Sequence, residues 1–280
     1  SEAHPGTRQS ALALNGAAAI LMEQNRHQEA MAIQRTLLSD YSGYIDEQLV
    51  RFRLAQNMLE NNDTDMAVEE LKLLLENAPM GRFAADATLE LAALAVIDGD
   101  LNAASEMYQE VIDNFPYHPR RLEAIRLAAE VMTKRERWDV AEAMWNRFLR
   151  EDTESIDSYR AHLALAEILI AQKRFDDALS HVEKAALAKD RSVISKSRLL
   201  KGKTLEKQGD EEGALKSYLK IGYLFPDQVE TVLDALLYAA SILKTQGKTD
   251  QMNRMLAKAS EKADTEARKM RVEKLKDELG

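Results

Sequence analysis

The feature that most constrains this chain is a period of about 37 residues. One position, which is alanine in six of its seven occurrences, returns along the chain at successive spacings of 37, 37, 37, 37, 36 and 38 residues. These anchor residues are Ala30, Ala67, Ala104, Ala141, Ala178, Ala214 and Met252. Regular self-similarity of this length is typical of helical repeat arrays, in which each unit packs mainly against its neighbours.

Each repeat is predicted to be a pair of helices with a short turn between them. A second small residue lies twelve positions before each anchor, where two helices that cross closely have no room for a larger side chain. These residues are Ala18, Ala55, Ala92, Ala129, Ala166, Gly202 and Ala240. Turns in which asparagine or glycine supplies a left-handed residue are expected at 61–63, 98–100, 208–210 and 246–248. Proline ends three of the second helices, at Pro79, Pro116 and Pro226.

Together these features resemble the tetratricopeptide repeat family over about residues 10–263, as seven units. The resemblance implies an all-α fold, a right-handed superhelical solenoid of about seven helix pairs. The period is about three residues longer than the family norm. The large residue usual early in the first helix is replaced by Arg51, Thr88, His162 and Arg198. This longer period, with Phe-Pro endings at 115–116 and 225–226, is similar to repeats of bacterial cell-envelope assembly proteins.

The chain is expected to comprise three segments. Residues 1–7 show no periodicity and contain Pro5 and Gly6, so we expect a disordered lead or a cloning remnant. Residues 8–263 form the solenoid. Residues 264–280 are predicted to form a capping helix, because an array needs an end with one polar face; a truncated eighth unit is the alternative. The first residue is Ser1 rather than methionine, and we expect a processed or trimmed form.

Composition and charge exclude several classes of function. The chain has no cysteine, so disulfides, thiolate metal sites and thiol nucleophiles are absent, but the compartment stays open. Its net charge of -9 argues against nucleic acid as a partner. Residues 1–140 carry 13 basic and 23 acidic side chains, whereas the charges of residues 141–280 nearly balance. No apolar run approaches the roughly 18 residues of a membrane span, so we expect no direct membrane insertion.

No catalytic, metal or cofactor site is predicted. The five histidines are scattered along the chain with no pairing at helical spacing, which disfavours a metal site. No nucleophile elbow, phosphate loop or other catalytic signature is present, so we expect no enzyme activity and no cofactor.

A basic stripe is the most informative local feature. Lys196, Lys203 and Lys207 are spaced seven and four apart and lie along one side of a helix. The tetratricopeptide resemblance places this stripe in the concave groove where partner peptides lie. The stripe is then a candidate site for acidic side chains or a C-terminal carboxylate, with an ordinary solvated helix face as the alternative.

The same resemblance, applied position by position to the second and third units, places five residues toward the groove. They are Phe52, Gln56, Leu89, Ala93 and Ile97. Large apolar residues there are candidates to anchor a partner's hydrophobic side chain, with packing against the adjacent helix as the alternative.

The sequence therefore predicts a non-catalytic protein–protein interaction scaffold that binds a segment of a protein or peptide partner. The sixth unit is expected to bind an acidic part of that segment. The predicted setting is the assembly of a bacterial multiprotein complex. One alternative is a recognition domain cut from a larger enzyme or regulator. Another is a self-assembling structural oligomer. The best location from the resemblance is the bacterial periplasm or cell envelope, with the cytoplasm as the alternative.

Overall fold

The structure is a computed structural model that describes residues 7–279, and over that range it contains fifteen α-helices, one short 3-10 helix and no strand. The lead expected for residues 1–7 lies outside the described residues, except for Thr7. Thr7 is the N-cap of α1 (Arg8–Glu23), and its hydroxyl oxygen accepts a hydrogen bond from the backbone N–H of Ser10 at 3.2 Å. The chain divides inside α7 (Arg121–Lys134) into two compact units, which meet between residues 131 and 132.

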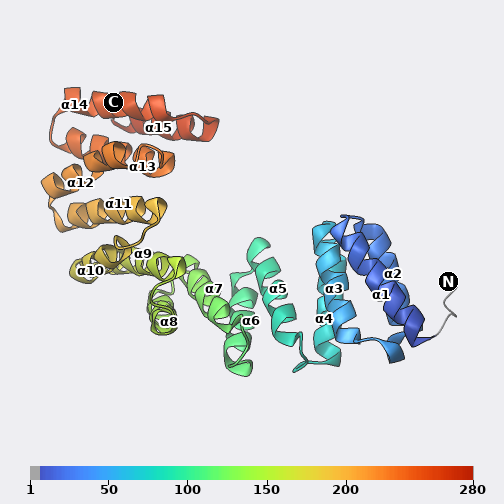
Figure 1. The fold of residues 1–280 in the computed structure, drawn as a ribbon. Coiled ribbons are helices and arrows are strands. Elements are labelled where there is room, and N and C mark those ends of the chain that lie inside the picture. Colours follow the sequence, from blue (N-terminus) through green and yellow to red (C-terminus); the bar gives the residue numbers. More distant parts are fainter. Residues whose placement is uncertain (1–6, 280) are drawn as a thin grey trace. The chain divides into compact units, whose positions relative to one another are not determined.

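The first unit is built from helix pairs α1/α2, α3/α4 and α5/α6, followed by the first part of α7 (Figure 1). After α1, its helices are α2 (His27–Asp40), the 3-10 helix η1 (Ser42–Tyr44), α3 (Glu47–Glu60), α4 (Thr64–Asn77), α5 (Ala84–Ile97) and α6 (Leu101–Asn114). The second helix of one pair packs on the first helix of the next, α2 on α3 and α4 on α5.

The second unit continues the same plan from the end of α7 to the cap (Figure 1). Its helices are α8 (Trp138–Glu151), α9 (Ile156–Ala171), α10 (Phe175–Ala185), α11 (Arg191–Gln208), α12 (Glu211–Leu224), α13 (Val229–Thr245), α14 (Thr249–Lys262) and α15 (Glu266–Leu279). The first helices of neighbouring pairs also touch here, because α11 contacts both α9 and α13. No helix among residues 7–279 combines the length and the apolar character that a membrane crossing requires.

The repeated small residues form the crossings between helices, as predicted. All seven anchors are buried, and each of the six alanines among them has no exposed surface. The seven small residues of the first helices are buried as well. Gly202, one of these small residues, lies against the ring of Tyr218, and the larger core side chains one turn after the anchors include Leu71, Tyr108, Trp145 and Tyr218.

Every turn between paired helices contains one residue in the left-handed conformation. Asn62, Gly99, Gly209 and Gly247 have positive φ angles, as predicted. The remaining three turns use Asn25, Glu136 and Lys173, and the last two were not expected because their side chains carry a steric cost at positive φ. Pro79, Pro116 and Pro226 each follow a helix C-cap residue, which agrees with the predicted helix ends.

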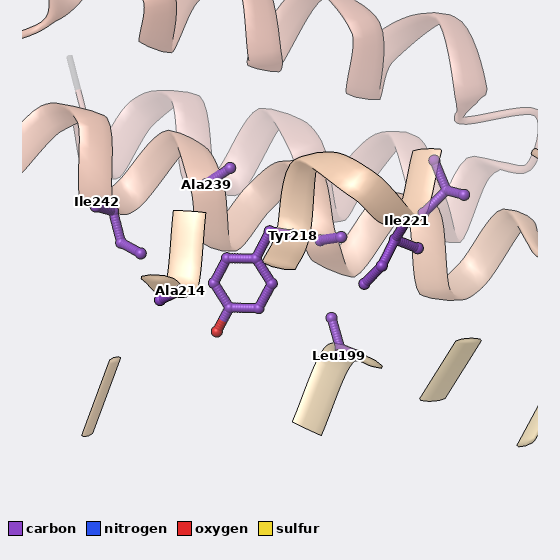
Figure 2. Packing of buried hydrophobic residues seen from close by; sticks show 8 residues of the cluster. Leu199, Ala214, Tyr218, Ile221, Ala239 and Ile242 are labelled. Carbon is purple, nitrogen blue, oxygen red and sulfur yellow. The ribbon is translucent and has the colours of Figure 1, made fainter. Parts of the chain in front are cut away.

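The core of the sixth repeat is centred on Tyr218 of α12. Figure 2 shows its ring among Leu199 of α11, Ala214 of α12, and Ala239 and Ile242 of α13. The hydroxyl group of Tyr218 donates a hydrogen bond to the Glu206 carboxylate at 2.8 Å. One aromatic residue thus ties three successive helices together.

Helix α15 packs against α13 and α14. Val272 is its one fully buried residue among those described, and it contacts Leu233, Ala259 and Ala263. The rest of α15 is mostly charged and exposed, and its role as a capping helix stays a prediction.

Candidate partner-binding groove

A cavity of about 420 Å³ lies where the first helices of three successive repeats meet, α9, α11 and α13. Its apolar lining includes Leu163 of α9 and Leu199 and Leu200 of α11, all largely buried. Lys196 and Lys203 line the same cavity from α11, two turns apart. The groove-facing side of α11 therefore combines an apolar floor with two cationic groups.

The structure brings two of the three stripe lysines to this cavity. Lys196 is exposed, and Lys203 is half-buried with its Nζ atom 4.9 Å from the ring centroid of Tyr238, a cation–π distance. Lys207 is exposed one turn further along α11 and does not line the cavity. The predicted stripe is thus a pair of lysines in the hollow and a third beyond its edge.

Acidic residues also line the cavity, but two of them are already paired with the cap helix. The Glu230 carboxylate contacts Arg268 Nε at 2.7 Å and Arg271 Nη1 at 3.1 Å. Asp234 is held by the second terminal nitrogen of Arg271. Because α15 supplies these arginines, the negative charge that α13 brings to the cavity is balanced without the lysines of α11.

The carboxyl group of Glu167 in α9 interacts electrostatically with Lys196 and Lys203. Desolvation by the surrounding protein raises the pKa of its carboxyl, and the nearby Lys203 and Lys196 oppose that rise. The side chain is still reached by solvent. Asp190 caps the start of α11, where its carboxylate accepts the backbone N–H of Val193 at 2.9 Å. Neither acid forms a direct ion pair with Lys196 or Lys203 in the part of the chain described.

The predicted apolar anchors of the second and third repeats have different exposures. Phe52 and Leu89 are buried, and Phe52 stacks on Phe83 with ring centroids 5.3 Å apart. Gln56 and Ala93 are half-buried, and Ile97 is 78% exposed at the end of α5. The burial of Phe52 and Leu89 favours packing between helices over contact with a partner, and leaves Ile97 as the large apolar side chain that a partner can reach among these five.

One arrangement of titratable groups was missed. His162 of α9 and His181 of α10 meet with their Nδ1 atoms 2.9 Å apart, although the sequence showed no pairing of histidines at helical spacing. Burial lowers the pKa of His162 to about 4, with further lowering by His181 and Lys184. The two residues lie 19 apart on facing helices, so only a repeat-by-repeat alignment of helix positions would have shown the contact. Among residues 7–279, no group of three or more potential ligand side chains is arranged to hold a metal ion.

The comparisons with known proteins agree with this architecture. The family model described as tetratricopeptide repeat matches residues 133–194. A search of curated proteins found no match.

Solved structures of repeat proteins share the fold at low sequence identity. The C-terminal part of a tetratricopeptide repeat-containing protein from Cytophaga hutchinsonii is similar with a TM-score of 0.68 and 15% identity, over 91% of this chain and 98% of that one. A tetratricopeptide repeat protein from Parabacteroides merdae gives 0.63 and 14%, over 95% and 98%. PilW, described as a widely conserved type IV pilus biogenesis factor, gives 0.55 and 18%, over 80% and 99%. This chain thus has the tetratricopeptide repeat fold, and its residues 133–194 match the tetratricopeptide repeat model by sequence.

Proposed function

We propose that this chain is a non-catalytic scaffold that holds an acidic segment of a partner protein in the groove of α9, α11 and α13. The tetratricopeptide repeat fold is consistent with a protein–protein interaction scaffold. The observation that carries the finer proposal is the 420 Å³ cavity with Lys196 and Lys203 on its wall and a floor of leucines. A side-chain carboxylate or a C-terminal carboxylate fits between the two ammonium groups, with an apolar neighbour on the floor.

The charge balance of the cavity supports an anionic rather than a cationic partner. The carboxylates of Glu230 and Asp234 are engaged by Arg268 and Arg271, whereas Lys196 and Lys203 have no ion-pair partner among the described residues. An arriving carboxylate therefore meets two available cations.

Assembly of a bacterial multiprotein complex is the setting we propose. The fold likeness to PilW, whose description is a type IV pilus biogenesis factor, supports this setting and a cell-envelope location. Ile97, in the first unit, is a second proposed contact, for an apolar side chain of a partner.

The test compares three forms of the chain as bait in native extract, with captured proteins identified by mass spectrometry. The first is the parent, the second carries Lys196→Glu and Lys203→Glu, and the third carries Lys258→Glu and Lys262→Glu on the exposed side of α14. The third form matches the charge change of the second away from the groove. We expect a partner that the parent and the α14 variant capture and the groove variant loses.

Binding that survives in the groove variant would place the partner elsewhere and refute the proposal. Circular dichroism of all three forms checks that helicity is unchanged. Light scattering of the parent over a range of concentrations tests self-association, and a mass that grows with concentration would favour the oligomer alternative.

A further inference from the structure

A second basic cavity lies on the opposite side of α11 from the groove. Its volume is about 270 Å³, and its lining includes Arg198 and Lys201 of α11 and Lys216, Ser217 and Lys220 of α12. At about 100° per residue, Arg198 and Lys201 lie roughly half a turn around α11 from the groove lysines. No carboxylate lines this cavity, and none of its four cations forms an ion pair within residues 7–279.

The second repeat shows one way in which a cation at this place is neutralised. Arg51 lies four residues before the crossing residue Ala55, and Glu70 lies three after the anchor Ala67; their side chains form an ion pair at 2.9 Å. In the fifth repeat the same two positions are His162 and His181, which also contact each other.

In the sixth repeat these two positions are Arg198 and Ser217, so the internal carboxylate is missing. Ser217 does not replace it, since its hydroxyl group donates to the backbone carbonyl of Gly213 at 2.9 Å.

Arg198 is held in place but not neutralised. Its guanidinium carbon lies 5.7 Å from the ring centroid of Phe225 of the same repeat. The Nε atom is buried and has no hydrogen-bond acceptor among the described residues. A buried donor on a charged group without an acceptor is costly, so the Arg198 guanidinium keeps hydrogen-bonding capacity that the described residues do not satisfy.

We propose that this cavity binds a phosphate group, which occupies the place that the Glu70 carboxylate has in the second repeat. Arg198 offers the fixed, planar donor pattern that suits an oxyanion, and Lys201, Lys216 and Lys220 supply point charges around it. The volume is below the range of about 300–1,000 Å³ usual for drug-sized ligands, so it suits a small anion or the terminal group of a larger molecule. The phosphate comes either free or as a monoester. This inference is independent of the partner groove.

The experiment is isothermal titration calorimetry of the whole chain with sodium phosphate, in chloride buffer at constant ionic strength. A second arm uses glycerol 3-phosphate, which carries the same group as a monoester. We expect saturable binding of one phosphate per chain, weakened by about tenfold or more in Arg198→Met because a charge-assisted hydrogen bond is lost. Lys258→Met, on the exposed side of α14 and outside the lining of both cavities, is the matched control and should bind as the parent does.

Ser217→Glu decides the question even if Arg198→Met folds poorly. This variant restores the carboxylate at the position of Glu70, so we expect a higher melting temperature without phosphate and loss of phosphate binding. Binding in both arms would show that the site accepts a phosphate on a larger molecule, and binding of free phosphate alone would show that it is closed to esters. No saturable heat in either arm, or equal affinity in the parent, Arg198→Met and Ser217→Glu, would overturn the proposal.

Discussion

Gly202 packs closely against the ring of Tyr218, and its replacement by alanine tests that packing directly. The other six repeats carry alanine at this position. A Cβ atom at Gly202 would lie 2.3 Å from Cε1, 2.7 Å from Cδ1 and 2.9 Å from Cζ of Tyr218. The ring cannot easily retreat, because it is 1% exposed, stacks on Tyr238 at 5.5 Å and donates its hydroxyl hydrogen bond to Glu206.

The expected magnitude follows from three opposing contributions. Overpacking a filled core costs about 1–3 kcal/mol, and displacing Tyr218 from the Glu206 carboxylate costs about 1.5 kcal/mol more. Replacing glycine by alanine inside a helix gains about 1 kcal/mol. We therefore expect Gly202→Ala to lower the free energy of unfolding by about 2 kcal/mol.

The assay is urea unfolding followed by circular dichroism, together with amide hydrogen exchange in α11 and α12, because a repeat array can open in parts. A Tyr218→Leu background provides the matched control, since Leu71 occupies the corresponding position of the second repeat beside Ala55. With the ring removed, Gly202→Ala should stabilise by about 1 kcal/mol. If alanine stabilises the parent chain as much as the Tyr218→Leu variant, the close approach of Gly202 and Tyr218 does not exist.

Two further predictions concern residues that the sequence did not single out. Lys173→Gly should raise the free energy of unfolding by about 0.5–1 kcal/mol, because Lys173 has a φ angle of 61° and glycine relieves this strain at some cost in unfolded-state entropy. Urea unfolding measures the change. A variant that is equally or less stable than the parent would contradict this prediction. Burial lowers the folded-state pKa of His162 to about 4 from 6.5, so the unfolded chain binds more protons between these values and stability falls as pH drops through that window. From pH 7 to about pH 5 we expect the free energy of unfolding to fall by about 1–2 kcal/mol after solvent screening. The His162→Gln variant should lose less stability over this range in urea unfolding, and an unchanged pH dependence in that variant would refute the prediction.

The helical architecture was predictable because its determinants are local and repeated. A close helix crossing demands a small residue at a fixed place in every unit, so one period in the sequence reveals both the helix pairs and their contact points. The turns were predictable only where glycine or asparagine marks the left-handed residue. At Glu136 and Lys173 the flanking helices impose the same left-handed conformation, although neither residue type favours it, so nothing in the sequence indicates it.

The candidate groove was less predictable, because a helix position fixes a direction but not what fills the space there. The repeat pattern placed Phe52 and Leu89 toward the groove, but both side chains are buried. The ion pairs of Glu230 and Asp234 with Arg268 and Arg271 depend on how α15 docks, which its composition alone does not determine. His162 and His181 meet because two helices of one repeat face each other, and neither helix shows the pair by itself.

Arg198 has no carboxylate partner in its cavity, whereas several other arginines of this chain are paired with carboxylates. Arg120 bonds Glu123 and Glu90, Arg174 bonds Glu142 and Asp177, and Arg191 bonds Asp227. A chain with a net charge of -9 has carboxylates to spare, yet in the sixth repeat they are absent from the cavity between α11 and α12. Like charges at close range destabilise a fold unless an anion lies among them. The second repeat has Glu70 beside Arg51, whereas the sixth repeat has Ser217 beside Arg198, and this missing carboxylate favours an external anion at that place.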